Sequence, residues 1–214
     1  YRSAGSPRGS SAIGYFDAAE AALTQAGPDA DPDRITVWLG RAAALRTLGR
    51  LDDAQRYVQR ARDLAADGTV PLAVRVELGA RTMLEAGTVN LHLGHLDAAR
   101  HDLEHANGLA AEHLTLAERI EGLGALALVE YVQSGLVVAA RHSSEALELA
   151  TDTALRLTGF AAPALLAQSL VAIDRHDLDA AAELESDTLD AAVHTEWEPF
   201  SYTAAGYQRL AARR

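Results

Sequence analysis

Apolar residues recur at helical spacing along most of the 214-residue chain. The stretch from Ile35 to Leu48 is an example, with apolar side chains three or four positions apart and a turn expected at Gly49. Few segments alternate apolar and polar residues, as a half-buried strand does. The pattern therefore predicts an all-α chain whose helices are separated by short, Gly-containing turns.

One short motif recurs along the chain, with Gly first, an apolar residue third, Asp fourth and Ala sixth. Clear copies occupy residues 14–19, 49–54 and 94–99, and weaker copies occupy residues 134–139 and 176–181. The apolar third residues are 35, 45, 40 and 42 positions apart. Gly permits the positive φ that ends a helix, and Asp suits the first turn of the next one. Each copy thus predicts the turn of a helical hairpin.

The repeats resemble tetratricopeptide repeats. The residues that match the spacing of that family best are Trp38, Ala42, Leu45, Gly49, Ala54, Val58 and Ala61. A second, passable copy consists of Met83, Gly87, Gly94, Ala99, Leu103 and Ala106. The resemblance implies a right-handed superhelical solenoid of about four to five antiparallel helix hairpins.

Three of the intervals exceed the tetratricopeptide period of about 34 residues. The additional residues fall upstream of the later hairpins, in 71–80, 113–120 and 152–161. We expect some first helices to be extended through these stretches, and Gly159 and Pro163 to break or kink the last of them. HEAT-type repeats have the longer period and are the structural alternative.

The two ends of the sequence differ from the middle. Residues 1–13 are rich in Ser, Gly, Arg and Pro, which predicts a flexible or irregular tail, or a poorly formed first helix, before a single helical-repeat domain at 14–214. Pro199 marks the start of a last helix, and we expect the domain to be truncated within a repeat there. The chain lacks an initiator Met, so we interpret it as part of a longer cytoplasmic protein.

Composition excludes several functions. The chain has no Cys, and its 19 basic residues are all Arg, so disulfides, thiolate chemistry and lysine-dependent sites are excluded. A net charge of −11 opposes binding to nucleic acid or anionic membranes. No apolar run approaches the roughly 20 residues of a membrane helix. We expect no cofactor.

Catalytic and metal-binding motifs are also missing, so we expect a protein that is not an enzyme. Asp97, His101 and His105 recur every four residues along one helix face. These side chains would suit a zinc or nickel ion. The favoured interpretation is a solvated convex face, because the neighbouring Ala and Leu residues are expected to form the buried side of this helix. Trp38 is expected in the core by its repeat position, whereas Trp197 could lie in the core or stack on a ligand.

In tetratricopeptide solenoids, the first helices of successive hairpins line a concave groove. The groove positions carried over by this resemblance are Thr36, Arg46, Arg81, Thr88, His92, Glu121, Tyr131 and Asp174. Arg46, Arg81 and His92 could bind a carboxylate or phosphate. The alternative for each is an ordinary polar group on an exposed helix.

The long, Ala-rich, Lys-free repeats also resemble the helical-repeat regions of large LuxR-type bacterial regulators of the maltose-activator kind. Residues 165–181 are the most similar stretch. That resemblance implies a region that senses an effector, either a small molecule or an inhibitory partner. A general scaffold for proteins or peptides, unrelated to transcription, is the second hypothesis, and self-association through the truncated end is the third.

Overall fold

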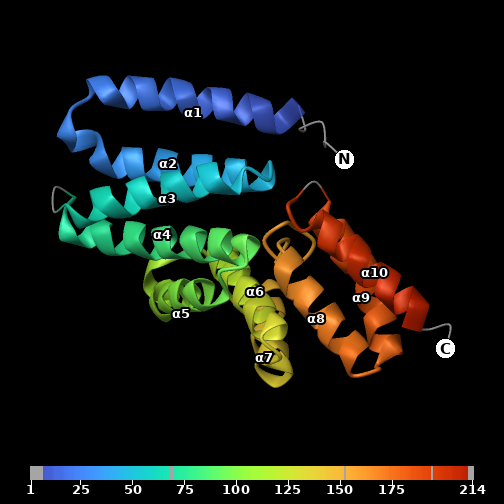
Figure 1. The fold of residues 1–214 in the computed structure, drawn as a ribbon. Coiled ribbons are helices and arrows are strands. Elements are labelled where there is room, and N and C mark those ends of the chain that lie inside the picture. Colours follow the sequence, from blue (N-terminus) through green and yellow to red (C-terminus); the bar gives the residue numbers. More distant parts are fainter. Residues whose placement is uncertain (1–6, 68–69, 152, 194, 212–214) are drawn as a thin grey trace.

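The computed structural model describes residues 7–67, 70–151, 153–193 and 195–211, and within these residues it is all-helical (Figure 1). Each helix packs against the next along the chain. The elements are α1 (Pro7–Gln25), η1 (Pro28–Ala30), α2 (Asp31–Thr47), α3 (Leu51–Ala66), α4 (Leu72–Leu93), α5 (Leu96–His113), α6 (Leu116–Val132), α7 (Leu136–Thr151), α8 (Ala162–Asp174), α9 (Leu178–Ala192) and α10 (Glu198–Ala211). The expected all-α class is confirmed for these residues.

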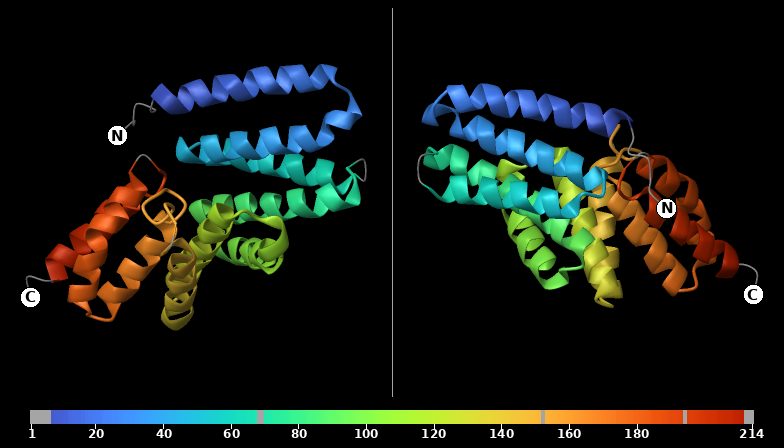
Figure 2. Two further views of the ribbon diagram at one scale, coloured as in Figure 1. Left: turned by 180° about the vertical axis from the view of Figure 1, so that it is seen from behind. Right: turned by 45° about the horizontal axis from the view of Figure 1, so that its top comes forward.

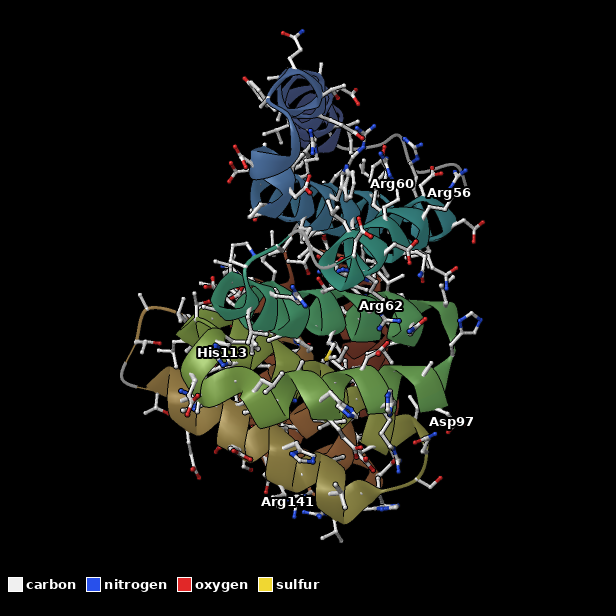
Figure 3. All side chains as sticks on the ribbon, turned by 90° about the vertical axis from the view of Figure 1, so that its left-hand side faces the viewer. Arg56, Arg60, Arg62, Asp97, His113 and Arg141 are labelled. Carbon is white, nitrogen blue, oxygen red and sulfur yellow. The ribbon has the colours of Figure 1, made fainter. Side chains whose placement is uncertain are left out.

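The first helices of the hairpins, α2, α4, α6 and α8, also contact one another directly, α2 with α4, α4 with α6, and α6 with α8. The second helices α3, α5 and α7 lie in successive tiers of another face, where Figure 3 shows Arg60, His113 and Arg141. Both views in Figure 2 place α1 at one end of the molecule and α8 to α10 at the other. The fold is therefore helical-repeat-like, with hairpins stacked side by side.

Small residues allow the close packing of these helices. Ala42, Ala54, Ala99 and Ala106 are fully buried, each within a cluster of Leu and Val side chains. Gly87 on α4 approaches α5 so closely that an added Cβ would lie 2.5 Å from Cγ of Leu103. Small side chains let helix axes approach, and the larger neighbours fill the remaining space to the density of a protein interior.

The hairpin turns confirm the repeat motif at four of its five copies. Gly49 and Gly94 adopt the left-handed conformation, with φ of 71° and 77°. At the two weaker copies the equivalent residues are Ser134 and His176, with φ of 66° and 59°. The turn geometry is thus kept where the glycine is not. The copy at residues 14–19 is wrong as a turn, because it lies inside the continuous helix α1.

Ser134→Gly is expected to stabilise the protein by about 0.5–1 kcal/mol. An L-residue in the left-handed region costs about 1–2 kcal/mol, and the greater entropy that glycine loses on folding offsets part of the gain. The measurement is urea unfolding followed by circular dichroism. Gly94→Ala, at the equivalent turn, should shift the midpoint in the opposite direction. Equal midpoints for Ser134→Gly and wild type would contradict the role of this turn.

Several expected boundaries need correction. Residues 7–13, expected in an irregular tail, form the first turns of α1, whereas residues 1–6 lie outside the described residues. The expected extension occurs in α4, which has 22 residues. It fails in α8, which has 13 and begins only at Ala162. Residues 153–161 form successive turns instead, in agreement with the break expected at Gly159 and Pro163.

Candidate functional site

A pocket of about 420 Å³ opens where the first helices α2, α4 and α6 meet two connections from the C-terminal half. The connections are the turns before α8 and the segment between α9 and α10, which Figures 1 and 2 show beside the end of α2. Its apolar lining includes Leu39, Ala43, Leu84 and Phe160. Its charged lining consists of Arg46, Arg81, Glu85, Glu118, Glu121 and Glu196. We call this the central pocket.

Arg46, in the last turn of α2, is the hub of the central pocket. Its Nε and Nη2 donate to the two carboxylate oxygens of Glu85 on α4, at 3.1 and 3.2 Å. Nη2 also donates to Glu121 on α6 at 3.2 Å, and Nη1 contacts Glu196 between α9 and α10. The Arg46 side chain is only 5% exposed. The guanidinium therefore connects α2 to α4, to α6 and to the segment between α9 and α10.

Burial makes the electrostatics of this cluster unusual. Burial alone would lower the pKa of Arg46, but Glu85 and Glu121 raise it, so the guanidinium stays charged. Burial raises the pKa of Glu85, Arg46 lowers it, and Glu121 raises it further, for a net increase. Three carboxylates compete for one guanidinium, so the cluster carries excess negative charge inside a partly enclosed site.

A second ion pair lines the central pocket on α4 and α6, about one helical turn from Glu85 and Glu121. Nε of Arg81 on α4 donates to Oε1 of Glu118 at 2.8 Å, and Glu77 lies 3.7 Å from the same guanidinium. Glu118 is held in place by the start of α6, because its other oxygen accepts from the backbone N–H of Thr115, which caps the helix in return. This reciprocal capping fixes the carboxylate toward the pocket.

The structure brings four of the eight sequence-predicted groove residues together in the central pocket: Thr36, Arg46, Arg81 and Glu121. Thr88 is fully buried, and its hydroxyl donates to the carbonyl of Leu84 within α4, so its placement on an open groove is wrong. Asp174 is exposed at the end of α8 and lines neither this pocket nor the second one described below.

The expectation that Arg46 and Arg81 present their guanidinium groups to an anion also needs correction. Both groups already contact carboxylates of the protein itself. Four Glu and two Arg line the pocket, so its lining has a net charge of 2 − 4 = −2. An anionic ligand would be repelled by these carboxylates, whereas a cation would be attracted.

Glu85, Glu118 and Glu196 line the central pocket but were not predicted from the sequence. Glu85 lies four residues after Arg81 on α4, and Glu118 lies three before Glu121 on α6, so both share a helix face with a predicted residue. That helical spacing was a usable signal. No sequence signal of this kind identifies Glu196, because its position depends on how the segment between α9 and α10 folds back to α2.

The remaining two predicted residues, His92 and Tyr131, line a second pocket of about 460 Å³ between α4, α6, α8 and α10. Trp197 and Phe200 line it too, and the ring of His92 lies 4.5 Å from that of Trp197 between centroids. We call this the apolar pocket. Trp197, left undecided by the sequence, is 3% exposed and packs in the core beside it. Trp38 is half-buried, and its indole donates to Glu20.

His92 is expected to make the protein less stable as the pH falls from 6.5 to 4. Burial, and then the charge of Arg46, lower the pKa of His92 from 6.5 to about 4. A lowered pKa means that the folded state favours neutral His92, so this contribution is complete above pH 6.5 and lost as the pH approaches 4. We expect a loss of about 2–3 kcal/mol.

The measurement is urea unfolding at pH 7.5 and 4.5. The change in unfolding free energy should be smaller in His92→Gln by this amount, whereas His95→Gln, an exposed histidine one turn away, should behave as wild type. Identical pH dependence in His92→Gln and wild type would refute the burial of a neutral imidazole.

The described residues contain no group of three or more metal-ligating side chains arranged to hold an ion. Asp97, His101 and His105 are exposed on α5, and the rings of the two histidines lie 4.3 Å apart between centroids. No helix in this part of the chain combines the length and the apolar character needed to cross a membrane.

Comparisons with known proteins show the fold alone. No family model matches the sequence, and no curated protein matches it. The crystal structure of BtubC (BKLC) from P. vanneervenii is similar, with a TM-score of 0.62 over 96% of this chain and 85% of that one. Sequence identity is 16%. The protein therefore has a helical-repeat-like, all-helical fold shared with a solved structure.

Proposed function

We propose that this chain is a non-enzymatic binding module whose central pocket receives an organic cation, either a small molecule or an Arg or amine group of a protein partner. The observation that carries the proposal is the shortage of positive charge around Arg46, where Glu85, Glu121 and Glu196 share one guanidinium. Their side chains are 12–15% exposed, so water screens them only in part.

The shape of the central pocket supports the same ligand class. Leu39, Leu84 and Phe160 offer apolar surface beside the carboxylates. A cation with an aliphatic body would bury that body against them and place its charge near the Glu residues. The volume suits a ligand of modest size or one side chain of a peptide.

The biological setting that we propose is the sensing region of a bacterial LuxR-type transcription regulator, built as a right-handed tetratricopeptide-like superhelix. The recurring turn motif and the Ala-rich, Lys-free repeats support it. A scaffold without a link to transcription is the alternative. The parent gene separates the two, because an ATPase segment before residue 1 and a helix-turn-helix after residue 214 would support a regulator, and other neighbours would support a scaffold.

The test of the cation site is calorimetric titration with two matched probes. Agmatine carries a guanidinium and an ammonium group, and 4-guanidinobutyrate replaces the ammonium with a carboxylate. We expect agmatine to bind at one site and 4-guanidinobutyrate to bind at least about tenfold more weakly, because the net negative pocket repels the carboxylate.

Charge-removing variants locate the binding. Glu118→Gln and Glu196→Gln should each weaken agmatine binding by about three- to tenfold, and Gln can still cap α6 at position 118. Glu112→Gln is the matched control, because its side chain is 86% exposed on α5, outside the pocket. Equal binding of both probes, or unchanged agmatine binding in both pocket variants, would refute the cation site.

A further inference from the structure

The carboxylates of the central pocket belong to two groups, each arranged around one arginine. The first, which we call the Arg46 group, consists of Arg46, Glu85, Glu121 and Glu196. The second, which we call the Arg81 group, consists of Arg81, Glu118 and Glu77. The pocket lining therefore offers two separate places where a positive charge could bind.

Both groups contain more carboxylates than guanidinium groups. Three carboxylates contact Arg46, and two contact Arg81. Glu77 is 51% exposed, so water screens its charge more than that of Glu118, which is 20% exposed. A ligand with a single charge can compensate the deficit at only one group. A ligand with two charges can compensate both, and it also balances the net charge of −2 on the lining.

The two groups are about one helical turn apart. On α4, Glu85 lies four residues after Arg81, and on α6, Glu121 lies three residues after Glu118. The contacts between helices keep the same register, because Arg81 pairs with Glu118 and Arg46 contacts both Glu85 and Glu121. Positions three or four residues apart on a helix face are separated by roughly 5–6 Å.

The surface beside the two groups is apolar. Leu84 lies on α4 between Arg81 and Glu85 in the sequence and lines the pocket. Leu39 and Ala43 line the same pocket from α2. Methylene groups that connect two charges would lie against these side chains and lose contact with water there.

The carboxylate of Glu118 can accept a further hydrogen bond although it is already paired. Its Oε1 accepts from Nε of Arg81, and its Oε2 accepts from the backbone N–H and the hydroxyl group of Thr115. An ionised carboxylate has about four acceptor positions in total. An ammonium group could therefore pair with Glu118 without displacing Arg81 or the cap of α6.

We propose that the ligand of the central pocket is a linear dication with about four methylene groups between its charges. One charge binds at the Arg46 group and the other at Glu118 of the Arg81 group. The inference rests on the proposed cation site and narrows its ligand class, because a ligand with one charge, such as a single amine or guanidinium group of a protein, would satisfy only half of the pocket.

The test compares butane-1,4-diamine with 4-amino-1-butanol by calorimetric titration at pH 7.5 and low ionic strength. The two probes have the same length, and a neutral hydroxyl group replaces one ammonium group in the second. We expect the diamine to bind at one site and about tenfold more tightly than the amino alcohol, because only the diamine places a charge at both groups. Equal affinities would overturn the proposal.

A longer pair of probes tests the spacing. Octane-1,8-diamine and 8-amino-1-octanol differ by the same charge, so their shared apolar contacts cancel in the comparison. An extended chain of eight methylene groups carries the second ammonium group beyond Glu118. The advantage of the diamine should therefore fall below about threefold. A tenfold advantage in both pairs would show that the spacing of the charges does not matter, and would overturn the proposal.

Two variants distinguish the ends of the ligand. Glu118→Gln should reduce the advantage of butane-1,4-diamine over 4-amino-1-butanol to less than about threefold, because it removes the charge that the second ammonium group meets. Glu196→Gln should weaken both probes and leave the advantage above about fivefold, because it acts at the Arg46 group. Glu112→Gln, exposed on α5, is the control and should behave as wild type. If folded Glu118→Gln and Glu196→Gln change the advantage equally, the arrangement in two groups is wrong.

The comparison of agmatine with 4-guanidinobutyrate on the same samples separates this inference from the proposed function. If agmatine binds selectively and the four-carbon probes bind equally, the cation site stands and the dication proposal fails. If neither agmatine nor butane-1,4-diamine binds, both fail. Circular dichroism and urea unfolding establish that each variant is folded before its binding is compared.

Discussion

Gly124→Ala is expected to lower the free energy of unfolding by about 2–3 kcal/mol, a large effect for one methyl group. Gly124 lies where α6 crosses the start of α8. An added Cβ would lie 2.6 Å from the backbone nitrogen of Ala164, 3.0 Å from Cγ of Pro163 and 3.1 Å from Cβ of Ala164. Backbone and a proline ring cannot rotate away, so the helices must separate, and overpacking of this kind costs about 1–3 kcal/mol.

Two other helical glycines provide the matched controls. A Cβ added at Gly79 on α4 or Gly108 on α5 would meet no neighbouring atom within 4 Å. Gly79→Ala and Gly108→Ala should therefore stabilise the protein by about 0.5–1 kcal/mol, through helix propensity alone. Urea unfolding measures all three variants. If Gly124→Ala proved as stable as these controls, the close crossing of α6 and α8 would be refuted.

Arg46→Leu is expected to have the largest effect of any substitution considered, a loss of about 3–5 kcal/mol at pH 7.5. Removal of the guanidinium leaves Glu85, Glu121 and Glu196 facing one another without a counter-ion, and isolation of buried charges has a cost of this size. The packing between α2, α4 and α6 should weaken, as should the attachment of the segment between α9 and α10.

The deficit of Arg46→Leu should shrink as the pH falls from 7.5 to 5. Burial already raises the pKa of Glu85 in the wild type, and Arg46 is the group that lowers it. Without Arg46 the folded-state pKa rises further, so the variant takes up protons on folding and is relatively more stable at low pH. Urea unfolding at both pH values measures this difference.

Arg81→Leu is the matched control for Arg46→Leu, because the Arg81 side chain is 31% exposed and pairs with Glu118 and Glu77. Its expected loss is at most about 1 kcal/mol. Equal losses in the two variants, or a deficit of Arg46→Leu that stays the same at pH 5, would contradict the buried carboxylate cluster.

The helices were predictable because their information is local. Hydrophobic spacing within one helix predicts the hairpins, and the motif at residues 49–54 predicts a turn that requires a left-handed residue. The turns at Ser134 and His176 were recognisable only because other positions of the motif persist. The turn predicted at Gly14 was wrong because a glycine tolerated inside a helix looks the same in the sequence as one that ends a helix.

The central pocket was only half predictable, for a physical reason. Repeat register places Arg46 and Glu121 on helices that face the same side, and this can be inferred from spacing. The partners of Arg46 cannot be inferred from spacing, because repeat register does not specify which side chains of opposite charge on neighbouring helices pair with each other. Glu196 contacts Arg46 across a separation of 150 residues, and Trp197, the next residue of the same segment, is buried.

An NMR titration of the arginine Nε–Hε signals with agmatine, assigned with Arg46→Lys and Arg81→Lys, determines directly whether the cation binds in the central pocket. We expect the Arg46 and Arg81 signals to shift along one saturating curve, whereas the signal of Arg62, which pairs with Asp102 outside the pocket, should stay unchanged. With 4-guanidinobutyrate at the same concentrations, little shift is expected. If agmatine saturates the protein by calorimetry and the signals of Arg46 and Arg81 do not move, the cation site is not the central pocket.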